Sequence, residues 1–249
     1  MSFKHISLAT LISLALLSGC ATTAGHSAAT EPANQVKIAQ ADERVLGYFS
    51  ADGEFGQEKS SNGYLRKYLG KTAEGKSVLQ DFYANNGKPQ TSPFVLFDDA
   101  GLEDWNSLQY TDGNIVFYNA DGKVSARAAL NEGRYVGEHI QYHGNGQAFV
   151  KEQYNPESEI TATTYYDEAG KPLFSFSIDS GNGDYKVDIK VYDAAGSAYP
   201  ATEAHEDKIQ AATDTIVALM NKRAALEAKL AGQDAPEPEA LILPRMPEE

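Results

Sequence analysis

One sequence frame recurs along the middle of the chain and limits what it can fold into. In this frame a tyrosine is followed by three mostly polar residues and then by glycine, as in VFYNADGKVS and TYYDEAGKPL. The frame glycines are Gly87, Gly122, Gly146, Gly170 and Gly196, at intervals of 35, 24, 24 and 26 residues. Because glycine takes positive φ without steric cost, each frame predicts the end of a strand followed by a hairpin turn.

Further turn signals lie between these frames, and the segments that separate them alternate apolar with polar residues. The additional signals are TDG at 111–113, NEG at 131–133, NPES at 155–158 and GNGD at 181–184, and Gly53 marks a degenerate earlier copy of the frame. In KVDIKVY, Val187, Ile189 and Val191 share one face of the predicted strand. The segment 94–105 supplies one extra strand and turn within the 35-residue interval. The pattern predicts a mainly β protein, a meander of successive β-hairpin repeats that forms an elongated twisted sheet.

The hydrophobic period changes after Pro200, where the sequence predicts one C-terminal α-helix. Thr202 is the expected N-cap, and Gly232 is the expected stop. One face is apolar except for an interruption at Arg223, and its members are Ile209, Ala212, Ile216, Leu219, Leu226 and Leu230. This face fits either packing against the molecule's own sheet or a coiled coil. The Pro/Glu-rich remainder, 232–249, is expected to be disordered, as is the start of the chain.

The N-terminus contains the only cysteine of the chain in a distinctive setting. Lys4 and His5 precede an apolar run of about a dozen residues, a length typical of a signal-peptide core and too short for a transmembrane helix. The run ends in Leu-Ser-Gly-Cys at 17–20, which resembles the lipobox of bacterial lipoproteins. That resemblance implies cleavage before Cys20 and acylation of its thiol and its new amino group. Ala21 is not the aspartate that implies inner-membrane retention in that family, so an outer-membrane location is expected.

These features divide the chain into five segments. The expected segments are a signal peptide at 1–19, the lipidated cysteine and a flexible tether at 20–42, the β-hairpin repeat domain at 43–200, the helix at 201–231 and the tail at 232–249. The repeat domain, over roughly 80–200, resembles the MORN-type tandem repeat in its bacterial antitoxin-like variant. The best match is NEGRYVGEHIQYHGNGQ, from Asn131 to Gln147. The resemblance implies a binding or scaffolding surface and no reaction.

Charge and motifs exclude several functional classes. The net charge of −14 becomes −15 when Lys4 is removed with the signal peptide, so nucleic acid is not an expected partner. His139 and His143 lie four residues apart on a predicted strand, about 13 Å at 3.3 Å per residue, too far to share a metal ion. We expect them to be solvated. The sequence contains no nucleophile elbow, no dinucleotide fingerprint and no thiol other than the one expected to carry lipid, so no catalytic residue, metal or cofactor is predicted.

The frame tyrosines are the candidate binding residues. The 24-residue period places Tyr118, Tyr142 and Tyr166 at equivalent points of neighbouring hairpins, where they would form a row. Such a row either contacts a partner or packs inside the domain's own core. The sequence therefore predicts a lipid-anchored envelope lipoprotein with a non-catalytic binding or scaffold domain and a protein partner. The alternatives are an immunity or antitoxin-like protein and an envelope hydrolase. The oligomeric state and the face of the outer membrane are left open.

Overall fold

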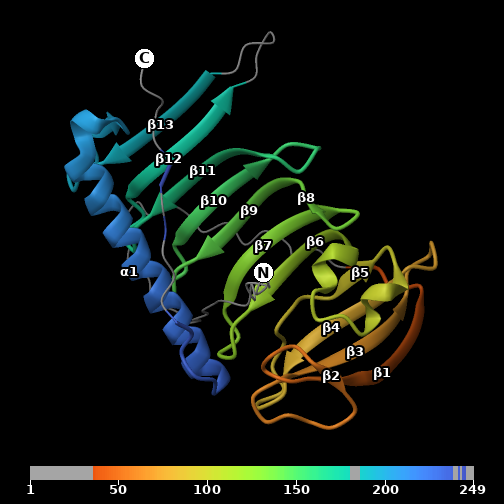
Figure 1. Cartoon of the computed structure of the whole chain (residues 1–249). Helices are drawn as coiled ribbons and strands as arrows, with labels where there is room; N and C mark the ends of the chain where they lie inside the picture. Colours follow the sequence, from red (N-terminus) through yellow and green to blue (C-terminus); the bar gives the residue numbers. More distant parts are fainter. Residues whose placement is uncertain (1–35, 180–185, 238–240, 242, 245–249) are drawn as a thin grey trace, which may run out of the picture.

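A computed structural model describes residues 36–179, 186–237, 241, 243 and 244. The predicted signal peptide, Cys20 and the GNGD turn at 181–184 lie outside the described residues. The described chain forms a 14-stranded antiparallel sheet and one long helix, which confirms the predicted mainly β meander with a C-terminal helix. Figure 1 shows the twisted sheet, with the helix crossing the strands on one side.

Strand order in space follows strand order in the sequence over most of the sheet. The strands are β1 (Gln40–Phe49), β2 (Phe55–Gly56), β3 (Tyr64–Lys71), β4 (Ser77–Tyr83), β5 (Phe94–Leu96), β6 (Thr111–Tyr118), β7 (Val124–Asn131), β8 (Arg134–Tyr135), β9 (Gly137–Tyr142), β10 (Ala148–Tyr154), β11 (Ile160–Tyr166), β12 (Pro172–Asp179), β13 (Lys186–Tyr192) and β14 (Ala198–Pro200). Their order is β14-β13-β12-β11-β10-β9-β7-β6-β5-β4-β3-β1-β2, and β8 pairs with β7 beside this path. Such short-range pairing is the geometry of successive hairpins.

Most hairpins share one turn geometry. In the turn after β6, the amide of Asn119 donates to the carbonyl of Lys123 at 3.0 Å, and the amide of Gly122 donates to the carbonyl of Asn119 at 2.8 Å. The same two bonds close the turns that begin at Ser50, Thr72, His143, Asn155, Asp167 and Asp193. The fourth residue of each turn has positive φ, and it is glycine except at Ser158, where φ is 69°. NPES forms this turn without glycine because Ser158 itself adopts the positive φ.

Side chains in one turn also bond to the backbone of the next turn. The Asn145 amide donates to the carbonyl of Glu168 at 2.7 Å, and the Lys171 ammonium donates to the carbonyl of Ala194 at 3.1 Å. Asn86 and Lys88 reach the carbonyls of Ala120 and Asp121 in the same way. The asparagines before, and the lysines after, some frame glycines therefore tie neighbouring hairpins together, which gives the repeated sequence a structural reason.

The left-handed turn position at Gly146 makes a direct prediction. Its φ is 86°, and a side chain there would meet no atom within 4 Å. Gly146→Val should therefore destabilise the fold by about 1–3 kcal/mol through backbone strain alone. Gly56 lies in β2 with equally open space and without positive φ, so Gly56→Val is the matched control and should be nearly neutral. Urea unfolding of the two variants measures the difference, and equal stabilities would contradict the proposed role of φ.

Two boundaries differ from the sequence expectation. The TDG segment is not a turn, because Asp112 pairs with Val95 and Gly113 pairs with Leu130 inside β6. The first strand begins at Gln40, inside the segment predicted as tether, because it pairs with the end of β3. The extra strand expected within 94–105 is β5, and it is followed by two 3₁₀ turns, Asp99–Leu102 and Ser107–Tyr110.

The C-terminal helix α1 (Glu206–Ala231) follows a 3₁₀ turn at Glu203–His205. Thr202 occupies the N-cap position of this 3₁₀ turn, as expected, but its side chain makes no capping bond, and the residue before α1 itself is His205. The expected stop at Gly232 is correct, since this residue has φ 73° and its amide bonds to the carbonyls of Ala228 and Lys229. Among the described residues, no helix has both the length and the apolar character needed to cross a membrane.

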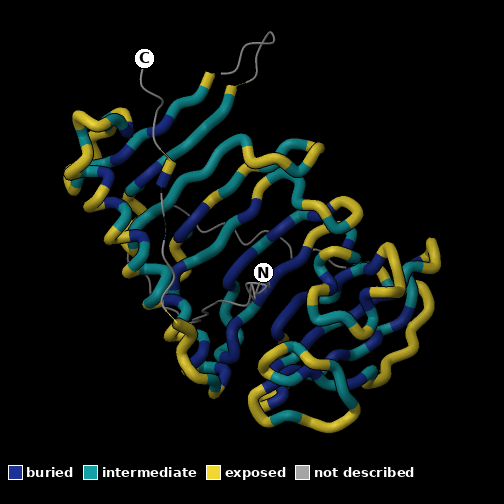
Figure 2. Tube along the Cα trace, in the orientation of Figure 1, coloured by how far each residue is buried: buried dark blue, intermediate teal, exposed yellow. Residues whose placement is uncertain are grey.

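Helix α1 packs on the molecule's own sheet and is fixed at both ends. Ile209, Ala212 and Ile216 join a core with strand residues Phe149, Val150, Phe174, Ile189 and Val191. At the other end, Ala231 packs with Phe49, Tyr64, Tyr83 and Ala120. A third core, built around Leu79, Phe94, Ile115 and Ala128, fills the β3–β7 region. Figure 2 shows buried residues along the strands and exposed residues at the hairpin tips.

Part of the predicted tail also contacts this fold. Leu243 is buried in the core under α1, and Leu241 packs against the same core. Gln233, just beyond the helix, donates to the carbonyl of Asn62 at 2.8 Å and to the hydroxyl of Tyr64 at 3.2 Å. The described residues after Gly232 therefore return to the sheet instead of leading away from it.

Candidate functional site

The three candidate tyrosines lie at equivalent positions of the sheet. Tyr118, Tyr142 and Tyr166 are the last residues of β6, β9 and β11, and their cross-strand partners are Val124, Ala148 and Pro172. These strands alternate with β7 and β10 in the sheet order. With neighbouring strands about 4.8 Å apart, the tyrosines follow one another at intervals of roughly 10 Å. Tyr192 continues the row on β13.

Strand alternation places this row on the face opposite α1, which we call the outer face. The residues before the tyrosines are Phe117, Gln141 and Tyr165, and all three line the space under α1. Because successive side chains point to opposite faces, Tyr118, Tyr142 and Tyr166 point away from the helix. Each of them is half-buried. Their rings thus lie on a surface and not in the three hydrophobic cores.

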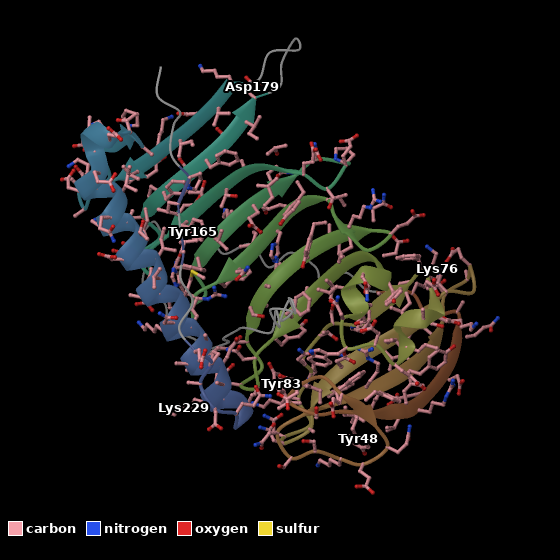
Figure 3. All side chains as sticks on the ribbon, in the orientation of Figure 1. Tyr48, Lys76, Tyr83, Tyr165, Asp179 and Lys229 are labelled. Carbon is pink, nitrogen blue, oxygen red and sulfur yellow. The ribbon has the colours of Figure 1, made fainter. Side chains whose placement is uncertain are left out.

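Tyr83, the first frame tyrosine along the chain, has a different environment from the other four. Tyr83 is buried, its hydroxyl donates to the carbonyl of Tyr118 at 2.8 Å, and burial raises its pKa. Figure 3 shows Tyr83 beside the C-terminal end of α1, whereas Tyr165 lies beside the middle of the helix. Of the two roles predicted for the frame tyrosines, partner contact or packing in the core, Tyr83 has the second. The row on the outer face begins at Tyr118.

A cavity of about 470 Å³ lies between the sheet and the second half of α1. Its helix wall consists of Met220, Asn221, Arg223, Ala224, Glu227, Ala228 and Ala231, which follow one another at one-turn intervals and so share one face. The sheet wall comes from β3, β4, β6, β7, β9, β10 and β11, and residues 233–237 close one side. The cavity forms because the helix side chains at this part of the interface are small. They are mostly alanines, whereas the core nearer the helix N-terminus is filled by isoleucines.

One end of the cavity contains a buried guanidinium. The Arg223 Nη1 donates to Gln141 Oε1 at 3.1 Å, and the guanidinium carbon lies 4.5 Å from the centroid of the Phe149 ring. Burial lowers the pKa of Arg223 to about 10, against the attraction of Glu227. The cation therefore has a ring face and an amide oxygen as partners, an arrangement that compensates part of its lost hydration.

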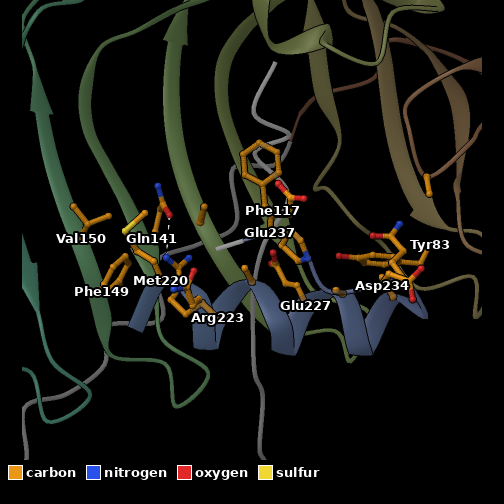
Figure 4. Close-up of a pocket in the computed structure, with 18 of the residues that line it drawn as sticks. Tyr83, Phe117, Gln141, Phe149, Val150, Met220, Arg223, Glu227, Asp234 and Glu237 are labelled. Atoms are coloured by element: carbon orange, nitrogen blue, oxygen red, sulfur yellow. Dashed lines mark hydrogen bonds between the residues drawn. The ribbon is translucent and has the colours of Figure 1, made fainter. Parts of the chain in front are cut away.

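The other end of the cavity is lined by Tyr64 and Tyr83. Glu227 lies between Arg223 and Tyr83 along the cavity (Figure 4). The residue as a whole is partly exposed, but its Oε1 is sealed from solvent and has no hydrogen-bond partner among the described residues. Burial raises the pKa of Glu227 well above its usual value, and the Arg223 charge offsets only part of that effect. The same carboxylate contributes to the raised pKa values of Tyr64 and Tyr83. The missing donor and the burial both favour the neutral, protonated form of Glu227.

The two histidines are not solvated, which corrects the sequence expectation. His139 and His143 are 3% and 1% exposed. His139 Nδ1 lies 2.8 Å from Glu152 Oε2, and its ring stacks on Tyr135. His143 Nε2 lies 2.9 Å from the carbonyl of Tyr166, and burial lowers its pKa. Both have structural partners from other strands, and the described residues contain no group of three or more side chains suited to hold a metal ion.

Sequence reasoning missed the cavity, although one signal pointed to it. Arg223 is an arginine on the apolar face of a helix, and a buried arginine needs hydrogen-bond or charge partners inside the protein. Glu227 follows at i+4 and faces the same side. The sequence treated Arg223 as an interruption, because nothing local reveals that β9 and β10 present Gln141 and Phe149 opposite it.

Comparisons with known proteins give only weak likenesses. No protein-family model matches the chain, and no curated protein matches it. Over 34% of its length the chain is similar to 21% of a chain in the GtfA/B complex bound to UDP and GlcNAc, at 19% identity and a TM-score of 0.22. Over 53% of its length it is similar to 20% of TarM, at 14% identity and a TM-score of 0.21. The chain thus spans about a fifth of the length of these structures, and likenesses at such TM-scores assign it to no family.

Proposed function

We propose that this protein is a lipid-anchored lipoprotein of the bacterial outer membrane whose β-repeat domain binds a protein partner and catalyses no reaction. The lipid anchor would be Cys20, as the resemblance of its surroundings to a lipobox implies. Two or more acyl chains suffice for stable attachment, since each buried methylene contributes about 0.8 kcal/mol. The domain would act as a MORN-like scaffold that presents one sheet face to its partner.

The tyrosine row on the outer face is the observation that carries the binding role. A tyrosine offers a large ring and a hydroxyl at the entropic cost of two side-chain torsions, which favours it at protein interfaces. Beside the row on the same face, cross-strand pairs join Lys151 to Thr164 and Ser175 to Lys190. The Ser175 hydroxyl lies 3.1 Å from the Tyr192 hydroxyl. Aromatic residues with polar neighbours have the composition of a transient interface.

The test is partner capture by a variant that leaves the fold intact. Tyr142→Ala should reduce the amount of crosslinked partner recovered from intact envelopes by tenfold or more, because an interface tyrosine contributes about 2 kcal/mol or more. Its melting temperature should change little, because Tyr142 is half-buried and outside the three cores. Tyr48→Ala, a half-buried tyrosine on β1, is the matched control and should keep full capture. Undiminished capture by Tyr142→Ala, or loss of the fold, would refute the role of the row.

An envelope hydrolase is the second candidate, because carboxylates converge on the cavity under α1. The lining includes Glu152, Glu227, Asp234 and Glu237. The described lining contains no serine, threonine, cysteine or histidine, so such an enzyme would use these carboxylates as its nucleophile or base. Binding ranks first because the tyrosine row supports it independently of the cavity. Hydrolysis of an envelope substrate that disappears in Glu227→Gln would favour the enzyme over the scaffold.

A further inference from the structure

We propose that the cavity under α1 binds one unbranched alkyl chain, which lies along the helix between Met220 and Ala231 and belongs to a ligand without an anionic head group. The site is separate from the outer face, so the inference does not depend on the proposed partner protein. A volume of about 470 Å³ falls within the range of small-molecule sites, and such sites are lined mostly by apolar and aromatic side chains. Alkyl chains of this kind occur in free compounds and in membrane lipids.

The helix wall makes the cavity long. Met220 and Ala231 both line it, and they are about 16 Å apart at 1.5 Å per residue. On the sheet side the lining extends from Val150 on β10 to Tyr83 on β4, so it crosses several strands. Figure 4 shows these residues spread along the helix. A cavity of this volume and length accommodates an extended chain better than a compact ring system.

Apolar side chains form much of both walls. They are Phe117, Ala126, Phe149 and Val150 on the strands and Met220, Ala224, Ala228 and Ala231 on α1. Water is a poor occupant of such a space, because a buried water takes about two to four hydrogen bonds from polar groups around it. A hydrocarbon chain loses no hydrogen bonds there, and it gains dispersion contacts with the walls and leaves water.

The polar side chains of the lining already bond to other protein groups. The bonded pairs are Tyr83 with the carbonyl of Tyr118, Glu152 with His139, Arg223 with Gln141, and Gln233 with Tyr64. Glu227 Oε1 has no donor among the described residues, but burial favours the neutral form of this side chain. The lining therefore offers hydrocarbon contact and few new hydrogen bonds, which selects an alkyl chain over a polar ligand.

Two exposed carboxylates disfavour an anionic head group. Asp234 and Glu237 line the side of the cavity that the segment after α1 closes, and both are exposed. The chain as a whole also has a net charge of −14. A carboxylate or phosphate at this side would be repelled by like charges, and deeper in the cavity it would lose its hydration.

Calorimetric titration with straight-chain alcohols from 1-pentanol to 1-octanol tests the proposal, in a buffer free of alkyl detergents, whose chains would compete. The association constant should rise about fourfold with each added methylene, because each one moves from water to an apolar wall. Octanoate has the same chain length and a negative charge, and cyclooctanol has the same carbon number in a compact ring. Each should bind at least about tenfold more weakly than 1-octanol.

A cavity-filling variant separates binding under α1 from binding at the surface. Ala224→Leu narrows the cavity without changing any charge, so it should weaken 1-octanol binding at least about tenfold. Ala225→Leu is the matched control, because Ala225 is the next residue, is exposed and lies outside the lining, and it should bind as the wild type does. Circular dichroism checks the fold of both variants. If Ala224→Leu does not fold, Ala224→Met fills the same space with a more flexible side chain and carries the same expectation.

A glyceride distinguishes the two sources of the chain. Tighter binding of 1-monooctanoylglycerol than of 1-octanol would identify the chain of a membrane lipid, and the reverse order would identify a free alkyl compound. The proposal would be overturned by an affinity that does not grow with chain length, or by octanoate or cyclooctanol binding as tightly as 1-octanol. Undiminished binding by the folded variant at Ala224, or no saturable binding by the wild type, would overturn it as well.

Discussion

Replacing Arg66 with alanine is expected to lower the free energy of unfolding by about 3–5 kcal/mol, because it leaves a buried carboxylate without its counter-ion. Arg66 is 0% exposed. Its Nε and Nη2 donate to the two carboxylate oxygens of Asp81, each at 2.7 Å. Its guanidinium carbon also lies 4.6 Å from the centroid of the Phe49 ring. The pair joins β3 to β4 in the interior of the N-terminal part of the sheet.

The same guanidinium holds the two 3₁₀ turns in place. Arg66 Nη1 donates to the carbonyls of Gly101 at 3.0 Å and Asp104 at 2.8 Å, and Nη2 donates to Ser107 Oγ at 3.1 Å. Arg66→Ala therefore removes the donors to a segment with little regular structure of its own. We expect residues 98–110 to become susceptible to protease in this variant, in addition to the loss of global stability.

Urea unfolding and limited proteolysis check this prediction. Arg134→Ala is the matched control, because Arg134 is exposed, and it should change stability by less than about 0.5 kcal/mol. Arg66→Met with Asp81→Leu removes both charges and should be less destabilised than Arg66→Ala. A loss below about 1 kcal/mol in Arg66→Ala would show that this buried pair does not hold the fold.

Sequence reasoning predicted the elements whose determinants are local. A hairpin needs a residue that tolerates positive φ, and glycine at 122, 146 and 170 marks those places directly. The helix ends at Gly232 for the same local reason. The alternation in KVDIKVY placed Val187, Ile189 and Val191 on one face of β13, and Ile189 and Val191 are buried. In each case the physical cause lies within a few residues of the feature.

Features that depend on distant partners were not predictable in this way. Gly113 has positive φ within β6 and pairs with Leu130, so a local turn signal there was misleading. His139 is buried because Glu152 on the next strand accepts its ring N–H and Tyr135 stacks on it. Alternation along a strand gives two faces, but it does not say which of them another element will cover.

The same distinction between local and distant causes applies to the candidate site. The 24-residue period gave the register of Tyr118, Tyr142 and Tyr166, because repetition carries long-range information. The cavity was not predictable, because it forms where Ala224 and Ala228 of α1 cross strands more than 100 residues earlier in the sequence, such as β3 and β4. Only the arginine within the apolar helix face hinted that this contact is not a simple core.

Replacing Cys20 with alanine is expected to abolish membrane anchoring, the largest effect in the proposed account. Without the thiol there is no acceptor for diacylglycerol, and cleavage of the lipoprotein type does not follow. Labelled palmitate should then be absent from the variant, and the uncleaved precursor should accumulate. Thr22→Ala, two residues further on, is the control and should be labelled and processed as the wild type is. Normal labelling and maturation of Cys20→Ala would remove the basis for a lipid anchor.

Intact mass spectrometry of the protein extracted from wild-type membranes shows directly whether the chain carries lipid. For a lipoprotein anchored through Cys20, we expect a mature chain that begins at Cys20 and carries the added mass of a diacylglyceryl group and one amide-linked acyl chain. A chain that retains residues 1–19, or one that begins at or near residue 20 without lipid mass, would contradict it.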